Sequence, residues 1–279
     1  MSDTQHADTS APSTHTPNPF ASDGSERFNA GNQTARCACT NHGFAIALGV
    51  LIAAALVTLA VLMAMNANDA FGWATIAVPV VLAVVFRVLE RRAMSPAVIG
   101  IVIALVALSC VLRFIRIPIQ GLQFTSWLVI VAGLALGAEP GFLAGALVPF
   151  ISNFWLGQGS WTPWEMLAWG LLGAIAGWIN GTHFSRNRWW MLVAGVCSGW
   201  VYGFILNMYS FLYMRTWNQG MFWSTIAAGL PGDTLSGVCT GILLFASIPW
   251  SIDLVRRVRV RNAAASDEHD ATLPHAERK

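Results

Sequence analysis

The segment from Gly157 to Gly170 holds the side chains best suited to chemistry in this chain. It reads GQGSWTPWEMLAWG, so three tryptophans, a glutamate and a glutamine interrupt long runs of Leu, Val, Ala and Ile. Aromatic faces with a few polar groups are the usual lining of a pocket for a ring-containing ligand. The same residue types form the aromatic belt at a membrane surface. We favour the pocket for the cluster as a whole and the belt for any single tryptophan.

The spacing inside this segment also predicts a helix start. Thr162, Pro163 and Glu165 occupy the N-cap, first and third helical positions of a capping box. Glu165 would then accept a hydrogen bond from the backbone amide of Thr162 and favour the positive end of the helix. We expect this structural role for Glu165 first and a ligand role second. Asp233, which follows a Pro-Gly pair, is expected to cap the last helix in the same way.

The elements that must position these residues are membrane helices. The chain has 279 residues, of which 55% are hydrophobic and 11% charged, and its mean hydropathy is +0.56. A soluble domain carries about 25% charged residues. The apolar runs are continuous rather than alternating, which indicates helices and not barrel strands. We therefore predict an all-α, polytopic membrane protein.

Eight transmembrane helices are predicted from the apolar runs. They span residues 44–65, 72–88, 97–112, 126–137, 140–155, 164–181, 189–210 and 233–250. The fourth is short, and Glu139-Pro140 separates it from the fifth. Residues 1–43 are polar and are expected to be disordered. The region 44–90 would hold two additional helices, 97–250 a six-helix core, and 251–279 a basic and then polar tail.

The distribution of Lys and Arg predicts that both termini lie in the cytoplasm, because these residues accumulate in cytoplasmic loops. With the N-terminus inside, 13 positive residues fall on the inner side and only Arg113, Arg116 and Arg215 on the outer side. We thus expect a multi-pass protein of the cell membrane. The three outer arginines stand out because they oppose the bias.

The sequence lacks the residues that several classes of function require. The only lysine is Lys279, so the chain has no P-loop for ATP. None of the six histidines lies in a predicted span, which argues against an intramembrane haem or zinc site. Cys37, Cys39 and His42 form at most an incomplete metal site. We predict no bound metal and no cofactor in this chain.

The predicted orientation collects aromatic and polar side chains on the outer side, in the loops after the third, fifth and seventh spans and before the last. Those chosen as candidate ligand-binding residues are Arg113, Arg116, Asn153, Gln158, Trp161, Trp164, Glu165, Asn207, Tyr209 and Asp233. For the arginines, an anionic ligand group and a lipid headgroup are open alternatives.

Small residues recur three or four positions apart on several predicted helices, where backbones can approach closely in lipid. The stripes are Ala97, Gly100, Ala104 and Ala107; Gly137, Gly141 and Gly145; Gly173, Gly177 and Gly181; Gly195, Gly199 and Gly203; and Gly237 and Gly241. We expect most of them to pack inside the chain, while one stripe could face another protein.

Residues 97–250 resemble the substrate-binding S component of energy-coupling factor (ECF) vitamin transporters, which are six-helix membrane proteins. The resemblance is carried by LGAEPGFLAGA at 136–146, SNF at 152–154, GQGSWTPWEM at 157–166, YGF at 202–204, NMYS at 207–210 and PGD at 231–233. The third motif is similar to the Gly-Pro-Trp-Thr-Pro-Trp-Gln-Met signature of the cobalamin-type group. It departs from it at Ser160 (Pro in the pattern) and Glu165 (Gln). Thr234-Leu235-Ser236 stand where the pattern carries a His after the Asp.

The resemblance implies a mechanism and partners. An S component captures a vitamin from outside, here with cobalamin or a related corrinoid as first candidate. It docks on a transmembrane coupling subunit through small residues of its first core helix, and two separate ATPase subunits hydrolyse ATP so that it topples and releases the ligand. Gly100 and Ala104 match the docking pair, which Ala97 and Ala107 extend. The chain itself would not be an enzyme.

Two alternatives are less well supported. A secondary transporter working alone would need a buried Asp, Glu or His near the middle of a span, and an inverted repeat, neither of which the sequence shows. A lipid-modifying membrane enzyme would need a metal-ligand set or a Ser/His/Asp arrangement, and no such pattern is present.

Overall fold

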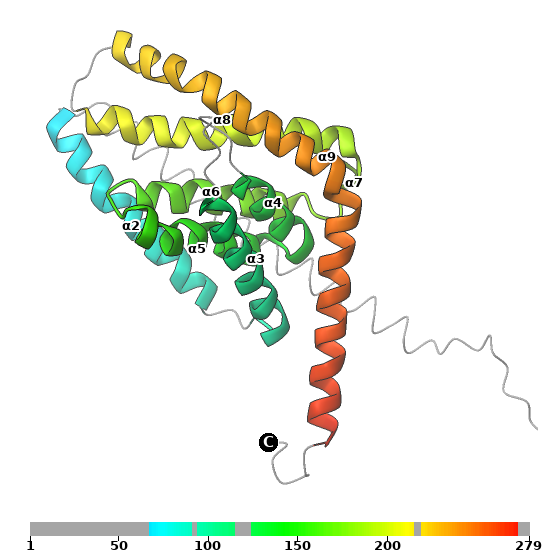
Figure 1. Cartoon of the computed structure of the whole chain (residues 1–279). Coiled ribbons are helices and arrows are strands. Elements are labelled where there is room, and N and C mark those ends of the chain that lie inside the picture. The colour runs from blue at the N-terminus through cyan, green and yellow to red at the C-terminus, as the bar shows by residue number, and fades with distance from the viewer. Residues whose placement is uncertain (1–66, 91–93, 115–123, 215–218, 273–279) are drawn as a thin grey trace, which may run out of the picture. The chain divides into compact units, whose positions relative to one another are not determined.

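The computed structural model describes residues 67–90, 94–114, 124–214 and 219–272, which all belong to one compact unit, Gly43–Lys279. In these ranges the regular structure is helical and no strand occurs. The helices, labelled in Figure 1, are α2 (Ala67–Glu90), α3 (Pro96–Phe114), α4 (Thr125–Leu136), α5 (Ala138–Leu156), α6 (Thr162–Trp178), α7 (His183–Arg186), α8 (Arg188–Tyr213) and α9 (Gln219–Thr272).

The all-α prediction is confirmed for the described residues. Six predicted spans, from 72–88 to 189–210, coincide with α2, α3, α4, α5, α6 and α8 apart from their ends. Three helical segments are long and apolar enough to cross a membrane: Pro96–Phe114, Arg188–Tyr213 and Gly220–Ser247. The predicted span 44–65, the tail 1–43 and the cysteine pair at 37 and 39 lie outside the described residues.

The prediction for the last helix was wrong. α9 begins at Gln219 and continues without a break to Thr272, so Pro231, Gly232 and Asp233 lie inside a helix and Asp233 caps nothing. Membrane helices tolerate Pro and Gly because neighbouring helices and hydroxyl side chains satisfy the freed backbone groups. Next to Pro231, the Thr234 hydroxyl donates to the carbonyl of Leu230 at 2.7 Å, a bond within the helix from residue i to residue i−4. The first part of the predicted C-terminal tail is therefore helical too.

The break between α4 and α5 falls at Gly137 rather than at Glu139-Pro140. Gly137 has a φ of 108°, a conformation that glycine adopts at little cost. Glu139 and Pro140 then occupy the first turn of α5, where a proline needs no backbone donor. α4 is buried over most of its surface because α3, α5, α6 and α9 surround it. This agrees with its uniformly apolar sequence.

Glycines bring α4, α5 and α6 into backbone contact. A Cβ atom added to Gly133 or Gly141 would overlap the carbonyl oxygen of Gly173, and one added to Gly145 would overlap the backbone of Trp169. These stripes thus pack inside the chain, as expected. Gly181 does not share this role: it has a φ of 82°, and a Cβ there would meet nothing within 4 Å.

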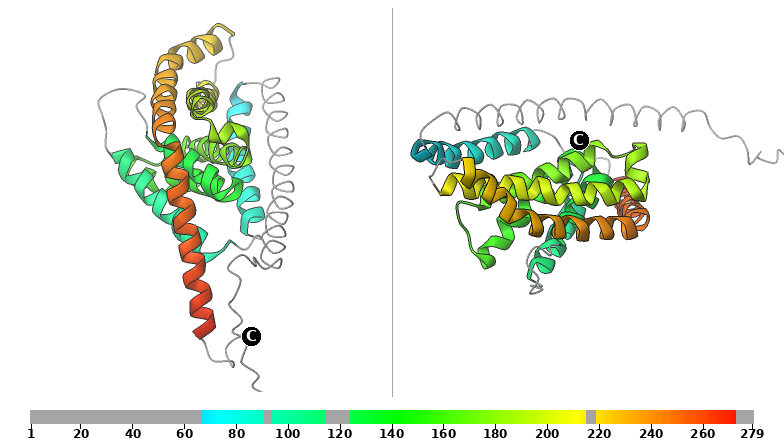
Figure 2. Two further views of the ribbon diagram at one scale, coloured as in Figure 1. Left: turned by 90° about the vertical axis from the view of Figure 1, so that its right-hand side faces the viewer. Right: turned by 90° about the horizontal axis from the view of Figure 1, so that it is seen from above.

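A second glycine interface joins α8 and α9, which run side by side in the right-hand view of Figure 2. Gly195 lies against the backbone of Gly241, and Gly199 lies against Gly237 and the carbonyl of Asp233. Gly203 faces the carboxyl group of Asp233 instead of a backbone. α8 and α9 therefore approach closely along their length, with one acidic side chain held between them.

α2 packs with one face against α6 and α8. Its buried residues recur at helical spacing and join a hydrophobic cluster that includes Phe142, Trp164 and Met208; on α2 they are Ala74, Val78, Leu82, Val85 and Leu89. Phe86 adds an edge-to-face contact with Phe142, with ring centroids 6.3 Å apart. α2 thereby supports the helices that carry Trp164 and Met208.

Candidate functional site

Four helices bring polar side chains together at one place, which we call the buried polar cluster. It comprises Arg113 from the last turn of α3, Ser152 and Asn153 from the end of α5, Thr162 and Glu165 from the start of α6, and Tyr202 from α8. Asn153, Ser152, Thr162 and Glu165 are all buried. Three sequence-predicted ligand residues, Arg113, Asn153 and Glu165, therefore converge here.

Glu165 is the centre of this cluster. Its Oε1 accepts from Arg113 Nη2 at 3.3 Å and from the Tyr202 hydroxyl at 3.4 Å, and its Oε2 accepts from Asn153 Nδ2 at 2.7 Å. The side chains of Arg113 and Glu165 are only 15% and 12% exposed. Because a buried carboxylate needs a compensating charge and hydrogen bonds, these contacts explain why Glu165 is tolerated at this position.

Arg113 is fixed on three sides. Besides Glu165, its Nη1 donates to the Ser152 hydroxyl at 2.7 Å, and its guanidinium carbon lies 4.7 Å from the centre of the Trp169 ring. Trp169 in turn stacks on Tyr202, with centroids 4.8 Å apart and planes at 28°. The indole N–H of Trp169 donates to the Ser126 hydroxyl at 3.1 Å. The arginine is thus held by an anion, a hydroxyl and an aromatic face.

The capping-box prediction for Thr162 and Glu165 was wrong, although α6 does begin at Thr162 with Pro163 in its first turn. The backbone amide of Thr162 donates to the carbonyl of Gly159 at 3.0 Å, so it is not left for Glu165. The Thr162 hydroxyl accepts from Asn153 at 3.0 Å and from the Gly159 amide at 3.3 Å. A charge-assisted bond to a guanidinium is stronger than one to a neutral amide, and the Glu165 side chain accordingly points to Arg113.

The aromatic candidates lie beside this cluster and differ in exposure. Trp164 is 8% exposed, and its ring centre is 6.1 Å from that of Tyr209. The Tyr209 hydroxyl lies 2.8 Å from that of Ser160. Trp161 is 39% exposed. Gln158 is exposed and donates to the carbonyl of Phe150 at 2.9 Å, so it holds the loop between α5 and α6 in place.

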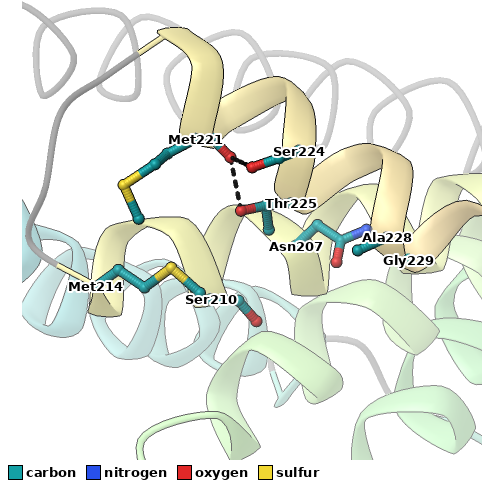
Figure 3. Close-up of a pocket in the computed structure, with 8 residues that line it drawn as sticks. All are labelled: Asn207, Ser210, Met214, Met221, Ser224, Thr225, Ala228 and Gly229. Carbon is teal, nitrogen blue, oxygen red and sulfur yellow. Dashed lines mark hydrogen bonds between the residues drawn. The ribbon is translucent and has the colours of Figure 1, made fainter.

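Asn207 and Asp233 form a separate pair between α8 and α9. Asn207 Nδ2 donates to Asp233 Oδ2 at 3.3 Å. Asn207 also lines an open pocket of about 450 Å³ between the two helices. Figure 3 shows its side chain directed toward Ala228 and Gly229 of α9. The lining is completed by Ser210 on α8, Met214 directly after α8, and Met221, Ser224 and Thr225 on α9.

Several residues of these sites were not among the candidates chosen from the sequence. Ser152, Tyr202 and Trp169 contact the ion pair; all three lie in quoted segments of the sequence, yet none was chosen as a candidate, because the spacing does not indicate the contact with Arg113 or Glu165. The pocket residues Ser224 and Thr225 carried a usable signal, since adjacent hydroxyls interrupt an apolar stretch. They fell outside the predicted last span, which began too late. Arg116, the remaining candidate, lies outside the described residues.

The predicted docking residues lie on an outward face of α3. Gly100, Ala104 and Ala107 are exposed and Ala97 is half-buried. A Cβ added to Gly100 would meet nothing within 4 Å. The opposite face, with Val98, Val102, Val106 and Cys110, is buried against α4, α5 and α9. The outward face of α3, with Gly100, Ala104 and Ala107, therefore has no packing partner among the described residues.

Within the ranges that the structure describes, no three His, Cys, Asp or Glu side chains come close enough to hold a metal ion.

Comparison with known proteins gives one finding. Residues 92–255, more than half of the chain, match the family model described as the ECF transporter substrate-specific component. No curated protein and no solved structure matches. The matched range runs from just before α3 into α9 and contains the buried polar cluster, the α8–α9 pocket and the outward face of α3. The chain belongs to the family of ECF transporter substrate-specific components, the membrane subunits that bind the substrate of these importers.

Proposed function

We propose that this S component captures a vitamin on the extracytoplasmic side of the cell membrane, and that the vitamin is cobalamin or a related corrinoid. One observation carries the proposal. The segment 157–166, which resembles the cobalamin-type signature, supplies Thr162, Trp164 and Glu165 to contacts with α5, α8 and α3. A segment that meets three other helices at one end of the bundle is well placed to sense a ligand there.

The chemistry of the neighbouring side chains supports a large, ring-containing ligand. Trp164, Tyr209 and Tyr213 form a connected row of rings, with centroids 6.1 and 5.9 Å apart along the row. Trp161 offers a further, partly exposed ring. Aromatic faces bury much area at low entropic cost, and the few polar groups among them orient the ligand.

The proposal includes the partners that the family uses. The S component would dock on a coupling subunit through Ala97, Gly100, Ala104 and Ala107, with two ATPase subunits supplying the energy. Both termini would be cytoplasmic, so that the Arg113 end of α3 faces outward. The exposure of three of these four small residues supports this docking face.

The test is ligand binding by the purified full-length chain in detergent. Calorimetric titration with a corrinoid, riboflavin, thiamin and biotin should give saturable binding of the corrinoid only. Trp161→Ala should weaken that binding at least about tenfold. Removing an aromatic side chain on which a nucleobase stacks costs about 1–3 kcal/mol of binding free energy, and we expect a similar cost for a ring of the ligand. Trp73→Ala is the matched control, since Trp73 is exposed on α2 outside the matched range.

A second measurement separates the proposal from a transporter that works alone. Uptake of labelled corrinoid should require co-expression of the coupling and ATPase subunits, which should co-purify with the chain. Uptake by the chain alone would instead support a secondary transporter. If none of the four vitamins bound, the assignment to vitamin uptake would be wrong.

A further inference from the structure

We infer that the Arg113–Glu165 pair makes the site select a neutral carboxamide group of its ligand over a carboxylate or phosphate. The inference rests on the proposed function, because it concerns which groups the captured ligand presents to the buried polar cluster. It differs from both alternatives left open for the arginines by the sequence, an anionic ligand group and a lipid headgroup.

The first step is the charge balance. Arg113 and Glu165 carry opposite unit charges 3.3 Å apart and are both largely buried, so the pair is neutral as a whole. A ligand anion that took Arg113 would leave Glu165 with only Asn153 and Tyr202 as partners. It would also place a second negative group beside the first. Both effects oppose an anion, since a buried charge without its counter-charge and two adjacent like charges are each unfavourable.

The second step is the geometry of the pair. Charge-assisted N–H···O bonds are usually about 2.7–2.9 Å long. The bond from Arg113 to Glu165 measures 3.3 Å and that from Tyr202 measures 3.4 Å, both to the same oxygen, Oε1. In contrast, Asn153 holds Oε2 at 2.7 Å and Ser152 holds Arg113 Nη1 at 2.7 Å. Each charged side chain is thus anchored by a short bond to a neutral side chain, while the bond that joins the two charged groups is long.

A primary carboxamide can bridge two groups held in this way by contacting both at once. It has one carbonyl oxygen, which can accept from Arg113 Nη2, and an NH₂ group, which can donate to Glu165 Oε1. Both charges stay compensated through the amide, and the short bonds to Ser152 and Asn153 need not break. A carboxylate offers acceptors only and leaves Glu165 without a donor in that direction.

The pair can be reached from one end of the bundle. Arg113 lies in the last turn of α3, Asn153 in that of α5 and Glu165 in the first turn of α6, so all three belong to the same end. Neither charged side chain is completely covered, and the adjoining Trp161 is partly exposed. A side group of a ligand held by these aromatics would meet the pair first.

The experiment compares two probes on the purified full-length protein. One is a corrinoid whose peripheral side chains end in carboxamides, and the other is the same corrinoid with these amides hydrolysed to carboxylates. At neutral pH the carboxylate form should bind at least about tenfold more weakly. Since hydrolysis changes several groups at once, the decisive quantity is how the ratio of the two Kd values responds to substitution.

Glu165→Gln removes the compensating anion and keeps the shape of the side chain. It should change the Kd ratio at least about tenfold in favour of the carboxylate form, because Arg113 then has a free charge. Glu90→Gln is the matched control: Glu90 pairs with Arg87 at 3.2 Å, but the two side chains are 70% and 78% exposed. That variant should leave the ratio unchanged, since an exposed pair contributes little.

A double variant, Arg113→Gln with Glu165→Gln, guards against a variant that fails to fold, because it leaves no unpaired buried charge. It should bind the carboxamide probe at least about tenfold more weakly than the native chain. Equal affinity of the native chain for both probes, an unchanged ratio in Glu165→Gln, or native affinity in the double variant would each overturn the inference while vitamin capture stands. If neither probe bound the native chain, the corrinoid assignment and this inference would fall together.

Discussion

The interface of α5 with α6 and the outward face of α3 carry small residues at similar spacing, but they end in opposite situations. Gly141 and Gly173 lie so close that a Cβ on either would overlap the backbone of the other helix. Gly100 on α3 meets nothing within 4 Å, and Ala104 and Ala107 are exposed. The spacing of small residues shows that another helix can approach closely. Whether it does depends on whether a helix packs against that face.

The difference follows from the other residues of each helix. α3 turns its β-branched Val98, Val102 and Val106 toward α4 and α5, which fills that interface with side chains and leaves the small residues outside. In lipid there is no hydrophobic force that hides a small-residue face, so it gains stability only from a close-packed partner. A second protein as partner of the α3 face is therefore our proposal, whereas α5 and α6 already serve as each other's partner.

The closed interface should be the most sensitive part of the molecule. Gly173→Val places a branched side chain against the backbone oxygen of Gly141, which cannot move without separating α5 from α6. We expect a loss of more than about 3 kcal/mol, and little folded protein on expression. Size-exclusion chromatography and thermal unfolding of the purified chain would measure this. Unfolding of Gly173→Val at the native temperature would show that α5 and α6 are not in close contact.

The α8–α9 interface offers a graded test, because its glycines face different atoms. At Gly195 the neighbour is the backbone of Gly241, and at Gly203 it is the carboxyl group of Asp233, a side chain that can rotate away. Gly195→Ala should therefore destabilise the protein by about 1–3 kcal/mol and Gly203→Ala by less than about 1 kcal/mol. Their unfolding temperatures, measured in the same detergent, give the order. A larger loss for Gly203→Ala would contradict the assignment of rigid and movable neighbours.

The comparison also shows what this sequence could and could not predict. Apolar runs placed six helices well, because in lipid a helix must satisfy its own backbone hydrogen bonds. The start of α9 was missed because Pro231 and Gly232 are helix breakers in water, whereas a membrane helix tolerates both residues. The role of Glu165 was misjudged for a related reason. Its local spacing fits a cap, but its counter-charge Arg113 is 52 residues away in the chain, a contact that only the fold creates.

Glycine stripes illustrate the same limit. Gly133 on α4 is absent from the predicted stripes although it contacts the backbone of Gly173, while Gly137 and Gly181 fit the spacing but serve turns with positive φ. Helical periodicity places residues on one face of a helix, yet it does not state where the helix ends. Hence the outermost member of a stripe is the least certain one.

The outward face of α3 should give the smallest effect on folding and a large one on transport. Gly100→Leu and Ala104→Leu add side chains where space is open, so we expect the free energy of unfolding to change by less than about 0.5 kcal/mol. Corrinoid binding by the purified chain should stay at the native level, because both residues lie away from the buried polar cluster. Uptake by cells that also express the coupling and ATPase subunits should be lost, since the added bulk keeps the backbones apart.

Ala83→Leu is the matched control for this last prediction, because it makes the same exchange on the exposed face of α2. It should bind and transport as the native chain does. Normal uptake by Ala104→Leu would show that docking uses another surface. A loss of both binding and uptake would show instead that a substitution on the α3 face changes the position of Arg113 at the end of the same helix. Native stability, native binding and absent uptake must occur together to identify the open face of α3 as a docking surface. That surface would then pack against a second protein as α5 packs against α6 within this chain.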